Sequence, residues 1–190
     1  FGLVHRSIDG SIILGEDNLP IATYSNETIQ NMARVFTGLG LSYGVNSAEE
    51  TIENTNFNRG FCGPANSTHY CWTQPMKFFP NQHDFNEKKL FIDDDQLVIP
   101  SSASQDSDQA LVELGLVLDG LVSHKTTAPF IARRLIQRFV TSNPSPGYIE
   151  RVAVAFGSDG DLRSTIKAIL LDSEARSPSV LNSKTFGKFK

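Results

Sequence analysis

Four amphipathic segments follow one another in the second half of the 190-residue chain, and they constrain its fold more than any other feature. Within each segment, apolar residues recur every three or four positions, as they do along one face of an α-helix. The predicted inward rows are Leu111, Leu114, Leu118 and Leu121; Ile131, Leu135 and Phe139; Ile149, Val152, Ala153 and Phe156; and Leu162, Ile166, Ile169 and Leu170. Because only a few residues connect the segments, neighbouring helices should run antiparallel. The sequence therefore predicts a mainly α fold built on an antiparallel helical bundle.

Residues that favour helix ends separate these segments. Thr126 or Thr127 is expected to cap the second helix, Ser145-Pro146 to open the third and Asp161 to cap the fourth. Gly157 follows the third apolar row as a stop signal.

One longer helix is predicted in the first half of the chain. Ser25 or Asn26 is placed to cap it, and Gly38 ends it. Its apolar row is Ile29, Met32, Ala33 and Phe36. A Ser-Ala-Glu-Glu capping box predicts a second, short helix at residues 47–50.

The stretch between residues 54 and 82 is rich in Asn, Gly, Pro and aromatic residues and has no helical period. We expect a long irregular loop there. A small β-hairpin is predicted to pair residues 76–79 with residues 90–92, with residues 97–99 nearby.

The length and composition are those of a folded domain. Hydrophobic residues make up 39% of the chain and charged residues 20%, which excludes the composition of a disordered protein. We expect a single domain fragment over residues 1–190, with a loop-rich acidic part at 1–104 and a four-helix, more basic part at 105–190.

Charge is distributed unevenly along the chain. Residues 1–124 carry 16 acidic and 6 basic side chains, whereas residues 125–190 carry 5 and 11. A basic segment of this kind binds nucleic acid or an anionic glycan in some proteins, and in others it attracts an acidic part of the same chain or only faces solvent. Because the whole chain has a net charge of −4, we expect no nucleic-acid partner.

No apolar run is long enough to cross a membrane. The longest candidate, Leu111–Val122, is interrupted by Glu113 and Asp119 and falls well short of the about 20 residues that a spanning helix needs. We expect no membrane span in this segment.

The two cysteines, Cys62 and Cys71, enclose eight residues within the predicted loop. We expect a disulfide that closes this loop, which would indicate an oxidising compartment. The alternatives are two free thiols or a zinc site with His69 and His83, although this spacing fits no common structural zinc site. The Asp93–Asp95 run is expected to be a solvated turn, so we predict no metal site and no cofactor.

Five polar residues are the candidates for a functional site. His83 and Asp84 are adjacent in a predicted turn, His124 lies at a helix junction, and Arg134 and Arg138 share a helical face. The arginines are candidates for binding an anion or carboxylate. We expect Asp84 to pair with Arg134 or Arg138, and His124 to satisfy backbone groups at its junction.

Three stretches of the sequence resemble the bacterial family called domain of unknown function 1800. They include residues 31–38, residues 83–88 and the C-terminal region from residue 118 onward. The most specific motif is SHKTTAPFIARRLIQRFV at residues 123–140, and GDLRSTIKAILLDSEAR at residues 160–176 resembles the closing helix of the family.

The resemblance implies a mostly helical, often exported bacterial protein that is longer than this chain, and it implies no particular reaction. We therefore expect a binding or assembly module of a secreted or cell-envelope protein, in the periplasm, the envelope or the extracellular space. Its partners would be the remaining parts of the same longer protein or a partner chain. The alternative function is a hydrolase-type enzyme with a polar site around His83, Asp84 and His124.

Overall fold

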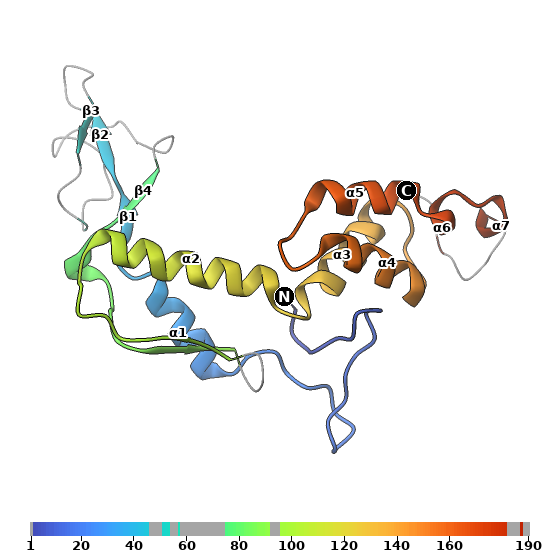
Figure 1. Cartoon of the computed structure of the whole chain (residues 1–190), viewed down its shortest axis with the longest axis horizontal. Helices are drawn as coiled ribbons and strands as arrows, with labels where there is room; N and C mark the ends of the chain where they lie inside the picture. Colours follow the sequence, from blue (N-terminus) through green and yellow to red (C-terminus); the bar gives the residue numbers. More distant parts are fainter. Residues whose placement is uncertain are drawn as a thin grey trace. The chain divides into compact units, whose positions relative to one another are not determined.

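The computed structural model describes residues 2–45, 51–53, 57, 75–91, 96–181 and 187. In these ranges the chain forms seven α-helices, one short 3-10 helix (η1) and three two-stranded antiparallel sheets (Figure 1). The elements are α1 (Asn26–Val35), β1 (Leu39–Leu41), β2 (Tyr43–Val45), β3 (Thr51–Glu53), β4 (Met76–Phe78), η1 (Pro80–Gln82), β5 (Lys88–Leu90), β6 (Leu97–Ile99), α2 (Ser107–Ser123), α3 (Thr127–Phe139), α4 (Pro146–Phe156), α5 (Leu162–Leu171), α6 (Ser173–Arg176) and α7 (Pro178–Leu181).

Several predictions made from the sequence fall on residues outside the described ranges. These are the short helix at 47–50, the cysteines Cys62 and Cys71 with the nearby His69, and the Asp93–Asp95 run.

The chain divides into two compact units, each of which draws on separate stretches of the sequence. Unit 1 comprises Phe1–Ser25, Phe91–Gln96 and Leu118–Lys190, whereas unit 2 comprises Asn26–Leu90 and Leu97–Val117. The chain therefore passes between the units four times, and the last of these boundaries, between Val117 and Leu118, falls within α2.

Unit 1 contains a small helical core in which α3 packs against α4 and α4 packs against α5. Its fully or nearly fully buried members are Ala132, Ile136, Val140, Tyr148, Ile149, Val152, Ala153 and Ile169. The predicted inward row of α4 is confirmed, because all four of its residues are buried. Two predicted caps are also confirmed: Ser145 accepts a hydrogen bond from the Tyr148 amide, and Asp161 accepts one from the Ser164 amide.

The N-terminal segment of unit 1, residues 2–25, is extended and held by isolated antiparallel bridges such as Val4 to Ala22. Its tight turn at Gly10 has a φ of +82°, a conformation that glycine adopts without strain. A Cβ at this position would lie 3.1 Å from two methyl carbons of Ile149, so the turn packs closely on the helical core.

Unit 2 is built from α1, the three small sheets, η1 and the first part of α2. Its core contains Phe78, Phe85 and Ala110, with Leu39 and Leu114 packed against them. Helix α1 packs against β5. These elements frame the turn that carries His83.

The predicted hairpin between residues 76–79 and 90–92 is wrong. Instead, β4 pairs with β1 in a register that places Phe78 opposite Leu39, and β5 pairs with β6, with Leu90 opposite Leu97. The partner of β4 is distant in sequence, which short-range turn signals do not reveal, whereas β5 pairs with the next strand along the chain.

The predicted architecture, one antiparallel bundle with a single hairpin, is wrong, although a mainly α chain is roughly correct. The described residues form two compact units with three separate two-stranded sheets. Helices α3, α4 and α5 form a helical core of the predicted kind, whereas α1 packs on a strand. Cys62 and Cys71, which the predicted disulfide would join, lie outside the described residues.

The predicted inward rows of α1, α2 and α3 are also displaced from the faces that the structure buries. In α1 the buried residues are Thr28, Asn31 and Val35; in α2 they are Ala110, Glu113 and Val117; and in α3 they are Thr127, Pro129, Ala132 and Ile136. The side chains of Leu111, Leu118 and Phe139 are about half exposed. Polar residues occupy inward positions in these helices, so the most apolar face is not the most buried one.

In the part of the chain that the structure describes, no helix combines the length and apolar character that crossing a bilayer requires.

Candidate functional site

The His83 turn connects η1 to β5 and has a locally determined backbone. Pro80 begins η1, and the His83 amide donates to the Pro80 carbonyl at 3.1 Å. The turn lies against Gly38, which has a φ of +75° and accepts a hydrogen bond from the Phe79 amide at 2.8 Å. A Cβ on Gly38 would lie 2.7 Å from the Phe79 carbonyl oxygen, so this close approach requires glycine.

The imidazole of His83 is completely buried between two phenylalanine rings. Its centroid lies 5.1 Å from that of Phe78 and 4.6 Å from that of Phe85, both in edge-to-face geometry. Nδ1 lies 2.8 Å from the Thr37 carbonyl oxygen, and Nε2 lies 3.3 Å from Oε2 of Glu113. Because a carbonyl only accepts, Nδ1 carries a hydrogen, and a bond from Nε2 to Glu113 needs a further proton on the ring or on the carboxyl group.

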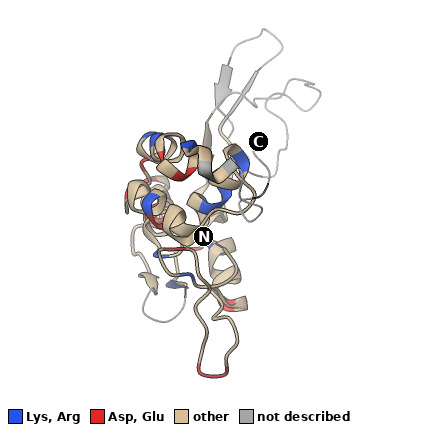
Figure 2. Ribbon diagram, turned by 90° about the vertical axis from the view of Figure 1, so that its right-hand side faces the viewer, with Lys and Arg blue, Asp and Glu red and all other residues tan. Residues whose placement is uncertain are grey.

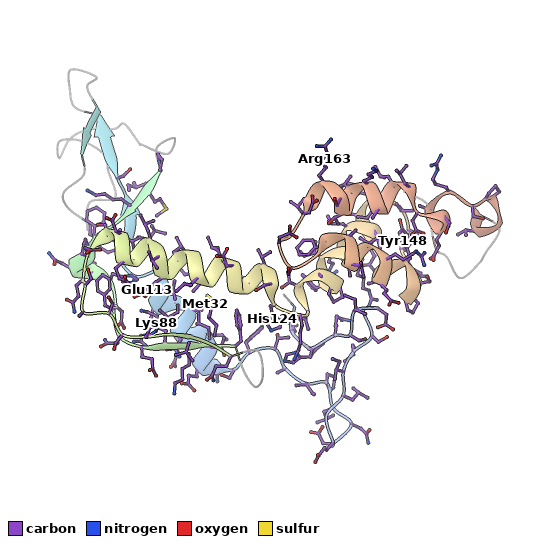
Figure 3. All side chains as sticks on the ribbon, in the orientation of Figure 1. Met32, Lys88, Glu113, His124, Tyr148 and Arg163 are labelled. Atoms are coloured by element: carbon purple, nitrogen blue, oxygen red, sulfur yellow. The ribbon has the colours of Figure 1, made fainter. Side chains whose placement is uncertain are left out.

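Lys88 completes a buried charge cluster with His83 and Glu113. Its Nζ atom donates to Glu113 Oε2 at 2.6 Å and to the Asn86 carbonyl at 3.1 Å. Neither Lys88 nor Glu113 has an exposed side-chain surface. Within the described ranges, Glu113 Oε1 has no hydrogen-bond partner. We call these three residues the buried cluster; Lys88 and Glu113 are labelled in Figure 3.

Asp84 forms its ion pair with Arg34 of α1. The guanidinium donates from Nε to Oδ2 at 2.6 Å and from one terminal nitrogen to Oδ1 at 3.2 Å. Asn86 adds a bond to Oδ1 from its backbone amide at 2.9 Å and another from its side chain at 2.8 Å. The hydrogen bond from Arg34 is the main cause that lowers the pKa of Asp84 well below its ordinary value, while partial burial acts in the opposite direction. The prediction of Arg134 or Arg138 as the partner is therefore wrong.

A pocket of about 440 Å³ lies on the outer side of the His83 turn. Its lining residues are Asn81, Gln82, His83, Asp84, Phe85, Asn86, Ser101, Ser102 and Gln105. Because the rings of His83 and Phe85 are buried, the groups that a ligand would meet are mainly amides and hydroxyls. We call this cavity the amide pocket.

His124 lies in unit 1, at the junction of α2 and α3. Its amide donates to the Gly120 carbonyl at 3.0 Å, and its Nδ1 accepts from the Thr126 amide at 3.2 Å. Its ring lies 5.7 Å from the ring of His5 and 5.1 Å from that of Phe91. These contacts are those of a residue that fixes a helix junction.

Arg134 and Arg138 belong to a larger group of arginines in unit 1; Figure 2 shows the described lysines and arginines of the chain in blue. A pocket of about 180 Å³ is lined by Arg6, Phe130, Arg133, Arg134 and Gln137. A second pocket of about 320 Å³ is lined by Arg134, Gln137, Arg138 and Ser142. Since Arg134 and Gln137 belong to both, the two pockets adjoin. We call Arg6, Arg133, Arg134 and Arg138 the arginine cluster.

Like charges lie near one another in the arginine cluster. Burial lowers the pKa of Arg6, and repulsion from Arg133 and Arg134 lowers it further. Arg6 donates to the Gly10 carbonyl at 2.7 Å, and Arg134 lies over the Phe130 ring at 5.5 Å. Among the residues that the structure describes, none of the four arginines forms an ion pair with a carboxylate.

The chain is related in sequence to a known protein family. Residues 13–190 match the family described as "Protein of unknown function (DUF1800)". The chain belongs to the DUF1800 family. Comparison with curated proteins and with solved structures gives no match.

Sequence reasoning missed Arg34, Lys88 and Glu113 in this DUF1800 chain. Two of these residues lie at positions that point inward. Lys88 and Leu90 are two residues apart and lie on the same buried side of β5, and Glu113 shares the buried face of α2 with Ala110 and Val117. A charged residue at an inward position indicates a partner at the matching position of another element.

Metal ligands do not gather in the described part of this DUF1800 chain, where no group of three His, Cys, Asp or Glu side chains is placed to hold an ion. His83 lies 3.3 Å from Glu113, and the remaining contacts of that carboxylate come from Lys88, a cation that competes with a metal.

Proposed function

We propose that this DUF1800 chain is a binding module that holds an oxyanion ligand at its arginine cluster. The observation that carries the proposal is the convergence of four arginines on two adjoining pockets without a carboxylate partner among the described residues. Guanidinium groups bind phosphate, sulfate and carboxylate groups through paired hydrogen bonds.

The repulsion among the positive charges of the arginine cluster supports an anionic ligand there. Arg134 and Arg138 are four residues apart on α3, a spacing at which like charges destabilise a helix by about 0.2–0.5 kcal/mol. Arg6, from the N-terminal segment, adds a further positive charge to the pocket that Arg133 and Arg134 line. An oxyanion would reduce this repulsion, and no described carboxylate forms an ion pair with these arginines.

The two pockets favour a ligand with more than one anionic group. Arg134 and Gln137 lie between them, so one ligand group in each pocket would face Arg134 from two sides. Ser142 and Gln137 supply neutral polar groups beside the charges. A diphosphate or a polymer with closely spaced anionic groups has this chemistry.

The hydrolase-type alternative has weaker support from the geometry. A catalytic base must reach the substrate, but the ring of His83 and the carboxyl group of Glu113 are completely buried. The Asp84 carboxylate is occupied by Arg34 and Asn86, which stabilise its charge and make it a poor base. His124 binds the backbone of its own helix junction. The unit 2 residues therefore support a structural role better than acid–base catalysis.

Titration with orthophosphate and pyrophosphate at constant ionic strength tests the proposal. Calorimetry should show tighter binding of pyrophosphate, and Arg133→Gln and Arg134→Gln should each weaken it by about tenfold, the equivalent of a lost charged hydrogen bond. Arg163→Gln is the matched control, because Arg163 is an exposed arginine of α5 that lines neither pocket (Figure 3). Equal losses in all three variants would indicate nonspecific charge attraction, and undetectable binding of both anions would contradict the proposal.

The cellular setting stays a prediction from the sequence. It comprises a bacterial source, a periplasmic, envelope or extracellular location, a partner in the same longer protein or in another chain, and the lack of a nucleic-acid ligand. Fractionation of cells that express the tagged protein tests the location directly.

A further inference from the structure

The amide pocket of unit 2 is lined by several polar side chains that make no hydrogen bond within the described part of the chain. The side chains of Asn81, Gln82 and Gln105 and the hydroxyls of Ser101 and Ser102 all line it, and none of the five makes a hydrogen bond in the described structure. Each amide offers donors and an acceptor, and each hydroxyl offers both as well. These side chains line one cavity of about 440 Å³ and can bond to a ligand in it.

Hydrogen bonds to neighbouring residues fix the backbone that forms this pocket. The Asp84 amide donates to Thr37 Oγ1 at 2.9 Å, and the Ser102 amide donates to the Phe85 carbonyl at 3.1 Å. Behind the wall, the buried cluster ties the His83 side chain to α2. A prearranged wall reduces the entropy that a ligand loses when it orders the site.

The charges around the pocket favour a neutral ligand. Asp84 contributes the carboxylate among the lining residues, and both of its oxygens already accept hydrogen bonds from Arg34. This carboxylate repels an anion, and its ion pair with Arg34 reduces its attraction for a cation. A ligand with many neutral groups that both donate and accept hydrogen bonds fits these conditions.

We propose that the amide pocket binds a neutral polyhydroxylated ligand, a sugar unit of a glycan. Its vicinal hydroxyls would match the amides of Asn81, Gln82 and Gln105 and the hydroxyls of Ser101 and Ser102. This site lies in unit 2 and goes beyond the proposed anion site, which lies in unit 1.

Titration of the full chain with neutral disaccharides tests the inference. We would record ¹⁵N–¹H spectra while adding maltose, cellobiose and N,N′-diacetylchitobiose, for which a single shallow pocket predicts dissociation constants of about millimolar size. The amide signals of residues 81–86 and 101–105 should shift with at least one of them. Asn81→Ala and Gln105→Ala should each weaken that binding by about two- to tenfold, as expected for one lost hydrogen bond.

Gln30→Ala is the matched control, because Gln30 is an exposed amide of α1 in the same unit and does not line the pocket. It should leave sugar binding unchanged, as should Arg134→Gln. The absence of saturable shifts with all three sugars would overturn the inference, and so would binding that Asn81→Ala and Gln105→Ala do not weaken. Since pyrophosphate is titrated separately, failure of the sugar site leaves the anion site standing, and the reverse also holds.

Discussion

The Nζ atom of Lys88 lies 2.6 Å from the Oε2 atom of Glu113, and neither side chain is exposed to solvent. This contact joins β5 to α2 across 25 residues of sequence. Taking two opposite charges out of water together costs far less than burying either one alone.

Removal of one partner should therefore strongly destabilise the protein. We expect Glu113→Ala to lower the free energy of unfolding by about 3–5 kcal/mol, because Lys88 remains buried and unpaired. The double variant Lys88→Met/Glu113→Leu should recover much of this loss, because it removes both charges of the Lys88–Glu113 pair, while His83 Nε2 loses its contact with Glu113. Urea denaturation of the three proteins measures both values, and a single variant that costs less than about 1 kcal/mol would show that the pair is not desolvated.

Stability at acidic pH should depend on Asp84. The pKa of its carboxyl group is lowered in the folded state, chiefly by the hydrogen bond from Arg34, whereas an unfolded aspartate has a pKa of about 3.9. The ionised Asp84 therefore contributes fully to the free energy of unfolding above about pH 4. This contribution declines as the pH falls toward the lower pKa of the folded state.

Asp84→Asn should thus be less stable than the wild type at neutral pH, by about 1–2 kcal/mol for a partly exposed bidentate pair, and the difference should shrink below about pH 4. Denaturation at several pH values checks this. A difference that does not change with pH would contradict the role of the charge.

Two glycine-to-alanine changes in unit 2 should have opposite effects. Gly38→Ala should destabilise by more than about 1 kcal/mol, because the position has positive φ and the new Cβ would meet the Phe79 carbonyl oxygen at 2.7 Å. Gly115→Ala should stabilise by about 0.5–1 kcal/mol, because this site is in the middle of α2 with no atom within 4 Å of the new Cβ. Thermal denaturation compares the two, and a similar effect of both changes would contradict the structure.

The phenol of Tyr148 should ionise only at an unusually high pH. Burial, followed by the charges of Asp172 and Glu174, raises the pKa of its phenol, which donates to the Ile169 carbonyl at 2.6 Å. Because the folded pKa is the higher one, its contribution to stability is full below the unfolded pKa of about 10 and is lost as the pH rises further.

Above pH 10 or so, the wild type should therefore lose stability more steeply than Tyr148→Phe, which has no group to ionise there. Urea denaturation between pH 8 and 11 compares the slopes. Parallel slopes would show that Tyr148 is not shielded in the folded protein.

Local signals in the sequence were sufficient for parts of unit 1. The caps at Ser145 and Asp161 act within three residues, and the inward row of α4 is apolar throughout, so periodicity and capping rules identified both. In these places the residue type and its position agree, and no distant partner is needed.

The same rules failed where polar side chains are buried for the sake of a distant partner. Asn31 is on the inner face of α1 because it donates to the Lys89 carbonyl of β5, 58 residues away. Glu113 is on the inner face of α2 because Lys88 lies opposite it. A rule that places apolar residues inward therefore rotates both helices incorrectly, and the partner of Asp84 was missed because it lies on α1, 50 residues away.

The buried contact between Lys88 and Glu113 also affects how α2 and β5 separate when unit 2 unfolds locally. If α2 moved away from β5, each charge would lose its partner before either was fully hydrated, so partial separation is less favourable than complete separation. The two elements therefore form one cooperative block, and their slowest amide protons should exchange with solvent with a common free energy of opening.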